Sequence, residues 1–586
     1  MGSLSDKKER TWWKEATIFQ IWQASFKDSN SDGIGDLGGV IQSLDYIRSL
    51  GVDAVWVSPF YESPQVDFGY DISNYEAIHK AYGTMADAEA LIDACHQRNM
   101  RILFDLVINH TSDQHPWFLE SRQSRKNPKR DWYIWKPPKY DENGNRKPPN
   151  NWRSNFGGSC WAWDEDTQEY YLHLFADAQP DLNWENRAMR EAVYDSAIRF
   201  WLRKGVDGFR VDTMTIYSKN PDYPDAPVAD PASLYQTGRK FYAHQSEVFN
   251  ILGEINQVLT EFGDDKMTVG EFGVLADTKM ALDYVSASKR RVSMGFQFET
   301  ACLGYSLNHW NLKGFSLVEF KASFEKWQRF IEGNDGWTCN FLENHDIARS
   351  VSRFANDDPM YRAAAAKALA TLLATSTGTL FLYQGQEIGM TNGPQEWDIR
   401  EYKDISASNY WKQVHDSTNG DEAALAQAMR NIRSVARDHA RTPVQWNDEE
   451  HAGFTDAPTG PWMGINDNYR EVNVQQQISD PDSVFAFWQN LLKLRKKHVE
   501  LFVYGSWETI DAADKYVMTY MKKSEGSNAL VMINFTTKDQ SCRDRAPPMF
   551  HNMEPVLTNM VNWKVDRLWP FEARVYIMEG DGPVAK

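Results

Sequence analysis

The sequence predicts an α/β protein built on a (β/α)8 TIM barrel, with a domain inserted after the third strand and an antiparallel β-sandwich at the C-terminal end. Three observations carry this prediction. Eight short apolar runs occur before residue 505, and stretches with helical spacing follow most of them. A long polar segment interrupts this alternation once, and strands without helices follow residue 505. The expected ranges are 1–110 and 186–505 for the barrel, 111–185 for the inserted domain and 506–586 for the β domain.

The first part of the chain alternates strands with helices. Nearly continuous apolar runs, typical of strands buried on both faces of a parallel sheet, predict strands at 17–22, 54–57 and 102–108. Residues 40–50 show helical spacing between the first two strands. Thr84, three residues before the acidic Asp87, predicts the N-cap of a helix that ends near Arg98.

The stretch 111–185 is rich in Trp, Pro, Asn and charged residues, and it is too long for an ordinary loop. Helical spacing resumes at 187–204. Further barrel strands are predicted at 208–211, 267–270, 292–298, 338–342 and 378–383, with helices at 363–375 and 484–498. Strands of the last domain are predicted at 516–521, 529–535 and 574–578. A doubly wound sheet is the alternative, but no Gly-rich phosphate-binding motif supports it.

The composition argues against several classes of partner. A net charge of −18 disfavours nucleic acid and anionic membranes, and no apolar run reaches transmembrane length. The 23 Trp, 25 Tyr and 30 Phe suit stacking on sugar rings, although aromatic residues also fill cores. Five scattered cysteines without a CxxC pair, and a first segment without a secretory signal, indicate reduced thiols in the cytosol. We expect a cytoplasmic monomer or weak homo-oligomer.

Polar side chains follow four of the predicted strands, and barrel enzymes place their chemistry at these strand ends. The candidates are Asn109 and His110, Arg210 and Asp212, Glu271, and the run from Glu343 to Asp346. Arg210 and Asp212 share one face of a strand, and a neighbouring cation lowers the pKa of a carboxylate. Asp212 is therefore expected to be ionised and able to act as a nucleophile. The alternatives are a buried structural ion pair here and ordinary loop polarity elsewhere.

Two carboxyl groups that flank a bond are the minimum for hydrolysing a glycoside. In this scheme Asp212 is the nucleophile, and Glu271 is the proton donor, with its pKa raised by burial and nearby negative charge. Asp346 binds sugar hydroxyls and stabilises the transition state. His110 and His345 donate hydrogen bonds to sugar oxygens.

The same residues form four short motifs that follow one another along the chain: 105–110, 208–212, Glu271 after a strand, and 343–346. In their order and spacing the chain resembles glycoside hydrolase family 13, the α-amylase family, and within it the fungal maltase and oligo-1,6-glucosidase branch. The resemblance runs from Trp12 into the last domain. It implies a retaining mechanism, with Asp212 as nucleophile, Glu271 as general acid/base and Asp346 as transition-state stabiliser. The inserted region matches the family's domain B.

The resemblance also implies roles for single residues around a pocket for an oligosaccharide. Asp67 matches a residue that binds terminal glucose hydroxyls, and Tyr70 one that stacks on the ring. Arg441 matches an arginine that pairs with the first of these, Asp67, and closes one end of the site, which implies attack at the non-reducing end. Phe156, Phe175 and Gln179 lie where relatives line the pocket from domain B. From the residues alone, a turn and a surface arginine are the simpler interpretations.

Thr213 bears on the linkage that is cleaved. In this branch the residue after the nucleophile tends to be Thr in α-1,4-cleaving enzymes and Val in α-1,6-cleaving ones. Thr213 therefore favours maltose, short maltooligosaccharides and sucrose, with transglucosylation at high sugar concentration. The alternative is an oligo-1,6-glucosidase, whose typical motif resembles residues 179–183. A non-catalytic binding homologue, like the amino-acid-transporter heavy chains, is disfavoured because all three acids are present.

Oxygen-bearing residues alternate along one early loop and predict a structural Ca²⁺ site. They are Asp28, Asn30, Asp32, the carbonyl of Ile34, and Asp36. Gly33 stands at the sharp turn, but Gly39 replaces the bidentate glutamate of an EF-hand. The resemblance favours calcium, since relatives carry it in this loop. An Asx-rich turn before the first helix is the alternative.

Overall fold

The computed structural model describes residues 10–231, 233–273, 275, 277–305 and 310–580. Its central element is an eight-stranded parallel sheet with the strand order β13-β12-β11-β5-β2-β1-β15-β14. The strands are β1 (Thr17–Ile21), β2 (Ala54–Val57), β5 (Arg101–Leu106), β11 (Gly208–Val211), β12 (Met267–Glu271), β13 (Met294–Phe296), β14 (Cys339–Asn340) and β15 (Thr379–Tyr383). A parallel bridge between Gly295 and Thr338 joins the two outer strands. The predicted barrel is confirmed.

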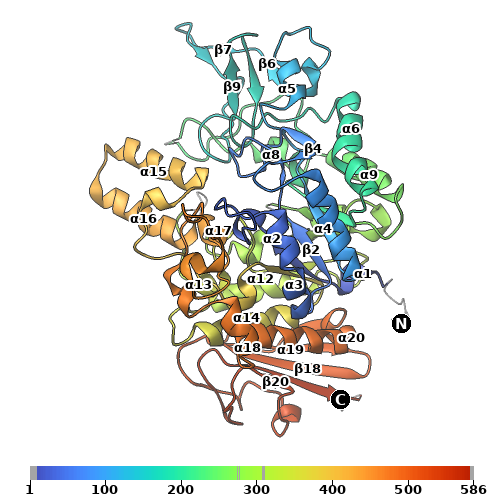
Figure 1. Ribbon diagram of the computed structural model, residues 1–586, viewed down its shortest axis with the longest axis vertical. Coiled ribbons are helices and arrows are strands. Elements are labelled where there is room, and N and C mark those ends of the chain that lie inside the picture. The colour runs from blue at the N-terminus through green and yellow to red at the C-terminus, as the bar shows by residue number, and fades with distance from the viewer. Residues whose placement is uncertain (1–9, 232, 274, 276, 306–309, 581–586) are drawn as a thin grey trace.

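Helices surround this sheet (Figure 1). They include α2 (Leu37–Gln42), α3 (Leu44–Leu50), α4 (Met85–Gln97), α9 (Val248–Thr260), α12 (Leu317–Arg329), α14 (Arg362–Ala374) and α19 (Val484–Lys497). The predicted cap is present, since Thr84 and Asp87 form a capping box at the start of α4. The helix predicted over 40–50 is divided at Ser43, whose hydroxyl donates to the Gly39 carbonyl four residues earlier, a bond that bends helices.

The inserted region contains the short strands β6 (Trp135–Lys136), β9 (Trp161–Asp164) and β10 (Glu169–Leu172), which form one antiparallel sheet. It projects from one end of the barrel (Figure 1). The last part of the inserted region contacts the barrel through Asp181. The ammonium group of Lys219 lies 2.8 Å from Asp181, and Asp181 pairs with His110 through a backbone bridge.

The last part of the chain is an antiparallel β domain at the opposite end (Figure 1). Its main sheet has the order β16-β17-β18-β22-β20, and β19 pairs with β21 in a second, two-stranded sheet. These strands are β16 (Ser506–Thr509), β17 (Val517–Ser524), β18 (Ser527–Asn534), β19 (Gln540–Ser541), β20 (Leu557–Thr558), β21 (Arg567–Leu568) and β22 (Ala573–Glu579). Helix α14 of the barrel packs against β18 and β22. Within the described part of the chain, no helix combines the length and apolar character needed to cross a bilayer.

Helices α15 (Ile405–Thr418) and α16 (Glu422–Val435) pack against each other as a hairpin beside the barrel (Figure 1). The hairpin leads directly into the short helix α17 (Asp438–Arg441). Its first helix reaches the inserted region, where Asn409 Nδ2 donates to the Phe156 carbonyl at 2.9 Å. The ring of Tyr410 stacks on Trp310 with a centroid distance of 4.6 Å. The hairpin thus touches two segments that are distant in sequence.

Candidate active site

Arg210 lies at the centre of the candidate site, on strand β11. Its buried side chain donates from Nη1 to Asp105 Oδ1 at 2.9 Å and to Asp212 Oδ1 at 2.5 Å. Its Nη2 atom donates to Glu271 Oε2 at 2.6 Å. Strands β5 and β12 flank β11 in the sheet, which brings these side chains together. One guanidinium group therefore holds both carboxyl groups that the sequence predicts as nucleophile and proton donor.

The pKa values of both carboxyl groups are raised. Burial is the main cause for Asp212, whose pKa reaches about 7 despite the opposing charge of Arg210. Burial also raises the pKa of Glu271 to about 7, with further contributions from Asp212 and Asp346. The raised pKa of Glu271 agrees with the prediction. The expectation of a lowered pKa for Asp212 is wrong, because the loss of hydration outweighs the ion pair.

Thr213 contacts both of these carboxyl groups. Its hydroxyl donates to Asp212 Oδ2 at 3.2 Å, and its backbone N–H donates to Glu271 Oε2 at 3.4 Å. Its φ of 42° places a β-branched residue in the left-handed region, which such residues rarely adopt. The backbone conformation at this strand end directs both donors of Thr213 toward the two acids.

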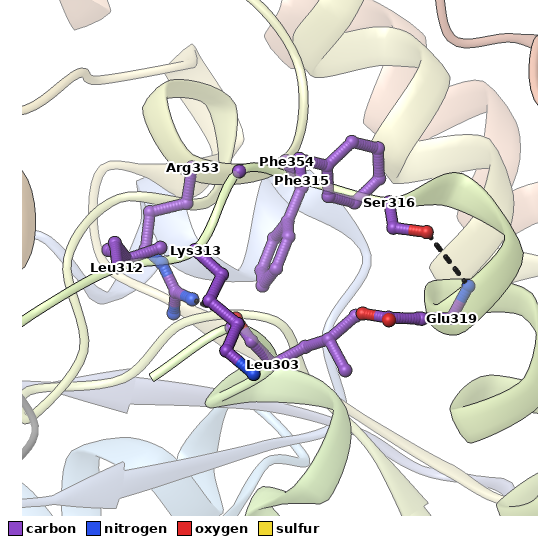
Figure 2. A pocket seen from close by; sticks show the side chains of 10 residues that line it. Leu303, Leu312, Lys313, Phe315, Ser316, Glu319, Arg353 and Phe354 are labelled. Carbon is purple, nitrogen blue, oxygen red and sulfur yellow. Dashed lines mark hydrogen bonds between the residues drawn. The ribbon is translucent and has the colours of Figure 1, made fainter. Parts of the chain in front are cut away.

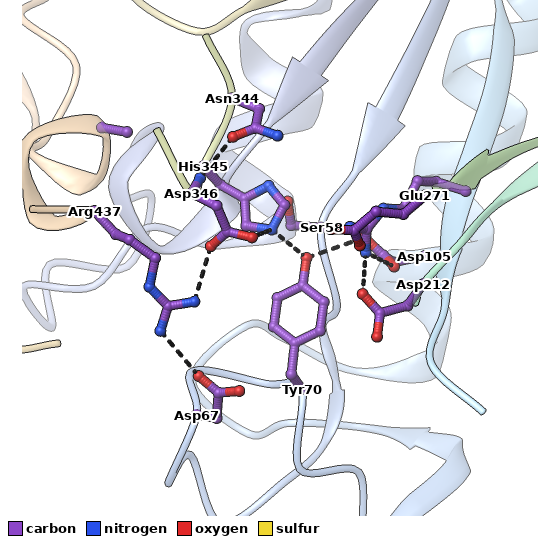
Figure 3. A network of polar contacts seen from close by, with 12 residues as sticks. Ser58, Asp67, Tyr70, Asp105, Asp212, Glu271, Asn344, His345, Asp346 and Arg437 are labelled. Atoms are coloured by element: carbon purple, nitrogen blue, oxygen red, sulfur yellow. Dashed lines mark hydrogen bonds and ion pairs between the residues drawn. The ribbon is translucent and has the colours of Figure 1, made fainter. Parts of the chain in front are cut away.

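Tyr70 links two halves of the site (Figure 3). Its hydroxyl donates to Asp105 Oδ2 at 3.2 Å and contacts His345 Nε2 at 2.6 Å. The other ring nitrogen of His345 contacts Gln20 at 2.7 Å, and Asp346 Oδ2 lies 3.3 Å from Nε2. Burial lowers the pKa of His345 to about 3, so its ring is neutral. The predicted contacts of His345 and Tyr70 with a sugar stay predictions.

Asp67 pairs with Arg437 and not with Arg441. Arg437 Nη2 lies 3.5 Å from Asp67 Oδ1, and Nη1 lies 3.0 Å from Asp346 Oδ1 (Figure 3). Arg441 instead contacts Asp346 at 2.9 Å and Asp404 at 2.8 Å. The prediction that Arg441 pairs with Asp67 is therefore wrong. The two arginines are four residues apart at helix α17 and therefore reach the same region, where Arg437 lies beside Asp67 and Arg441 beside Asp404.

The residues predicted from the inserted region lie around Asp67. The buried Gln179 donates from Nε2 to Asp67 Oδ2 at 3.1 Å and lies 3.1 Å from His110 Nε2. The ring of Phe175 packs 5.1 Å from the ring of His110, and Phe156 packs 5.8 Å from Phe175. Burial lowers the pKa of His110 to about 4. The structure thus brings these residues together, while their roles toward a sugar stay predictions.

Arg437 and Asp404 were not predicted from the sequence as site residues, and Asp105 was given only as the first residue of a motif. The spacing of Arg437 from Arg441 was a signal that could have revealed it. Asp105 stands within a recognised motif, as the strand residue beside Arg210. Asp404 lies in a loop before α15, where no local pattern identifies it.

The predicted calcium loop is a turn rich in hydrogen bonds to carboxylates. Asp28 accepts three backbone N–H groups, Asp32 accepts the N–H of Ile34, and Asp36 caps helix α2. These bonds match the Asx-rich turn that was the alternative. Among the residues that the structure describes, no three His, Cys, Asp or Glu side chains converge as a metal site. The carboxylate, amide and carbonyl oxygens of the loop nevertheless suit Ca²⁺ chemically, and calcium binding stays a prediction.

A separate cavity lies between the segment 312–316 and helix α13 (Ser350–Phe354) (Figure 2). It is lined by Leu303, Gly304, Leu312, Lys313, Gly314, Phe315, Ser316, Glu319, Arg353 and Phe354. None of the predicted site residues belongs to this lining. Its volume of about 20 Å³ holds about one water molecule, so it is too small for a sugar.

Comparisons with known proteins identify the family to which the barrel and its acidic residues belong. Residues 20–505 match the family model described as alpha amylase, catalytic domain. An alpha-glucosidase from Candida albicans is 49% identical over 97% of this chain and 100% of its own length. An oligo-1,6-glucosidase, IMA3, from Saccharomyces cerevisiae is 42% identical over 99% of this chain and 100% of its own length.

Solved structures of related proteins have the same overall fold. The isomaltulose synthase of Erwinia rhapontici NX5, determined with sucrose, is 37% identical and superposes with a TM-score of 0.89 over 97% of this chain and 99% of its own. The trehalose-6-phosphate hydrolase of Bacillus licheniformis is 37% identical, with a TM-score of 0.87 over 97% of this chain and 100% of its own. With its barrel, its carboxyl groups and these relatives, the chain belongs to the α-amylase family and is a glycoside hydrolase.

Proposed function

We propose that this protein is a retaining, exo-acting α-glucosidase that releases terminal α-1,4-linked glucose from maltose and short maltooligosaccharides. The observation that carries the proposal is the bridge from Arg210 to both Asp212 and Glu271. Retaining glycosidases hold their two carboxyl groups roughly 5 Å apart, whereas inverting ones leave wider room for a water molecule. Two acids on one guanidinium favour the closer spacing.

In the proposed mechanism, Asp212 attacks the anomeric carbon while Glu271 protonates the departing glycosidic oxygen. Glu271 then removes a proton from water, which releases glucose from the covalent intermediate. Near neutral pH the raised pKa values let the two acids share one proton, and Arg210 supplies the positive charge that keeps the other ionised. A sugar hydroxyl that replaces the water would give transglucosylation.

The exo mode is supported by the cluster around Asp67. Asp346 and Asp67 are joined through Arg437, with Gln179 behind Asp67. Burial would raise the pKa of Asp346, but His345 and the charges of Arg437 and Arg441 outweigh it and keep the pKa below its usual range. An ionised Asp346 can accept hydrogen bonds from sugar hydroxyls and favour a positively charged transition state. The family resemblance implies that an arginine paired with Asp67 closes one end of the site, which would leave room for a terminal glucose.

The α-1,4 preference rests on Thr213, because relatives with either activity in their names are about equally similar to this chain. An alpha-glucosidase, MAL32, of Saccharomyces cerevisiae is 43% identical, close to the value for the oligo-1,6-glucosidase. The alternative is therefore an oligo-1,6-glucosidase. Glucose release from maltose, isomaltose, sucrose, trehalose and maltotriose decides between them. We expect maltose and maltotriose to be cleaved fastest, and faster cleavage of isomaltose would contradict the proposal.

The proposal includes the other properties predicted from the sequence: cleavage of sucrose, a structural Ca²⁺ held by loop 28–36, a cytoplasmic location and a monomeric or weakly associating state. The loop oxygens support the Ca²⁺ site, because they are the ligands that Ca²⁺ prefers. Five cysteines without disulfides among the described residues support the cytoplasmic location. Sedimentation at several protein concentrations would test the oligomeric state.

A further inference from the structure

Asp404 is a buried carboxylate between two arginines of the site. Its Oδ2 atom lies 2.6 Å from Arg437 Nη2 and 2.8 Å from Arg441 Nη1. Asp404 and Arg441 are each 1% exposed. Burial alone would raise the pKa of Asp404, but the two guanidinium charges lower it, so the group is ionised. An ionised group at this depth is tolerated only because its charge is fully paired.

The opposite nitrogens of the same arginines reach the sugar-binding side. Arg437 Nη1 and Arg441 Nη2 lie 3.0 Å and 2.9 Å from Asp346 Oδ1. Arg437 Nη2 also lies 3.5 Å from Asp67 Oδ1. Asp404 therefore pairs with two guanidinium groups whose other nitrogens hold Asp346, while Arg437 Nη2 contacts both Asp404 and Asp67. Two arginines this close repel each other, so a carboxylate on the far side fixes both their charge balance and their planes.

The position of Asp404 is itself fixed by the backbone. Its Oδ1 atom accepts the N–H of Ser406 at 2.9 Å and caps helix α15. The N–H groups of Lys403 and Asp404 donate to Asp438 Oδ1 at 2.6 Å and 3.0 Å. Asp438 is the first residue of helix α17, which ends at Arg441. The loop that carries Asp404 is thus tied to the helix that carries one of its arginines.

We propose that Asp404 is a positioning residue that orients Arg437 and Arg441 toward Asp346 and Asp67. It does not touch the sugar; it acts through the two arginines. This inference rests on the proposed role of Asp346 and Asp67 in binding terminal glucose. It extends that site to a residue in the loop before the α15–α16 hairpin.

The test is the affinity for glucose, measured by calorimetry without turnover, in Asp404→Asn and Asp404→Glu. Asp404→Asn keeps the size of the side chain but removes its charge, and we expect it to weaken glucose binding at least tenfold. Asp404→Glu keeps the charge but displaces it by one methylene, and we expect a smaller loss. The matched control is Asp398→Asn, which breaks the exposed pair with Arg400 and leaves affinity unchanged.

A purely structural role would lower the melting temperature of the variants without changing the affinity of the folded fraction. Affinity within twofold of wild type in folded Asp404→Asn would overturn the proposal. If that variant does not fold, Asp404→Glu decides, and wild-type affinity there has the same meaning. Wild-type protein that binds glucose but does not cleave maltose would contradict the proposed function. The glucose affinities of the Asp404 variants could still be compared with that of the wild type. Wild-type protein that does not bind glucose would overturn both.

Discussion

The Thr213 hydroxyl donates a hydrogen bond to the Asp212 carboxylate at 3.2 Å. The backbone of Thr213 has a φ of 42°, in the left-handed region. A left-handed conformation at a β-branched residue costs free energy, and such strain persists where the surrounding structure requires it. Here it directs the hydroxyl to the proposed nucleophile and the N–H to Glu271. The residue that suggested the linkage is thus also a contact of both acids.

Replacing Thr213 tests this contact. Thr213→Val keeps the branched side chain and loses the donor, and a hydrogen bond to a charged group contributes roughly 1.5–3 kcal/mol. We expect kcat/KM for maltose to fall at least tenfold, while Thr213→Ser, which keeps the hydroxyl, stays within about threefold. The ratio of isomaltose to maltose cleavage should rise in the Val variant. Equal rates for the Val and Ser variants would show that the hydroxyl is not used.

The raised pKa values predict the pH dependence of activity. The pKa of Glu271 is raised to about 7, and a general acid must be protonated, so kcat/KM should fall as the pH rises through about 7. The pKa of Asp212 is raised to about 7 as well, and a nucleophile must be ionised, so activity should also fall on the acidic side.

The expected profile is a narrow bell with its maximum near neutral pH, measured as kcat/KM for maltose from pH 4 to 10 in constant ionic strength. Glu271→Gln, assayed with an aryl glucoside whose leaving group needs no proton, should lose the alkaline limb. An alkaline limb that persists unchanged in this variant would show that another group is the acid.

We predict that the contact of Asn409 with the inserted region limits the length of the substrate. Its side chain bonds the Phe156 carbonyl and connects α15 with the inserted region. Asn409→Ala removes this connection, so we expect α15 and the inserted region to separate more easily. We expect turnover of maltotetraose relative to maltose to rise about threefold, consistent with the loss of about one hydrogen bond. Gln413→Ala, exposed one turn later on α15, is the control. An unchanged ratio in Asn409→Ala would rule out this limit.

Calcium removal tests the loop 28–36. A metal that binds only the folded state stabilises it, so dialysis against a chelator should lower the melting temperature by several degrees, with recovery on adding Ca²⁺. Elemental analysis should find one equivalent before dialysis. Asp32→Asn should weaken retention of the ion, since the exposed Asp32 carboxylate accepts only the Ile34 N–H in this loop and keeps oxygen lone pairs for a cation. A protein without bound calcium and without a thermal shift would leave only the Asx-rich turn.

The amino-acid sequence alone predicts the barrel elements and the acidic residues that the structure brings together. Strands that are apolar on both faces, and the Thr84–Asp87 cap, are local patterns, and they predicted the barrel strands and helix α4. Residues at the ends of barrel strands meet at one edge, so Asp212 and Glu271 could be placed together without coordinates. The pairing of Arg210 with Asp212 is also local, because the two residues share a strand face, whereas the contact of Arg210 with Glu271 joins neighbouring strands.

The ion pairs and the protonation of the site depend on how the chain folds in three dimensions. The sequence favoured Arg441 as the partner of Asp67, but the fold places Arg437 there instead. Asp404 joins the site through contacts with residues more than thirty positions away along the chain. The pKa of Asp212 is raised although an arginine lies beside it, because desolvation depends on how much protein surrounds a group. Burial and long-range contact are properties of the folded chain, so a local sequence pattern does not indicate them.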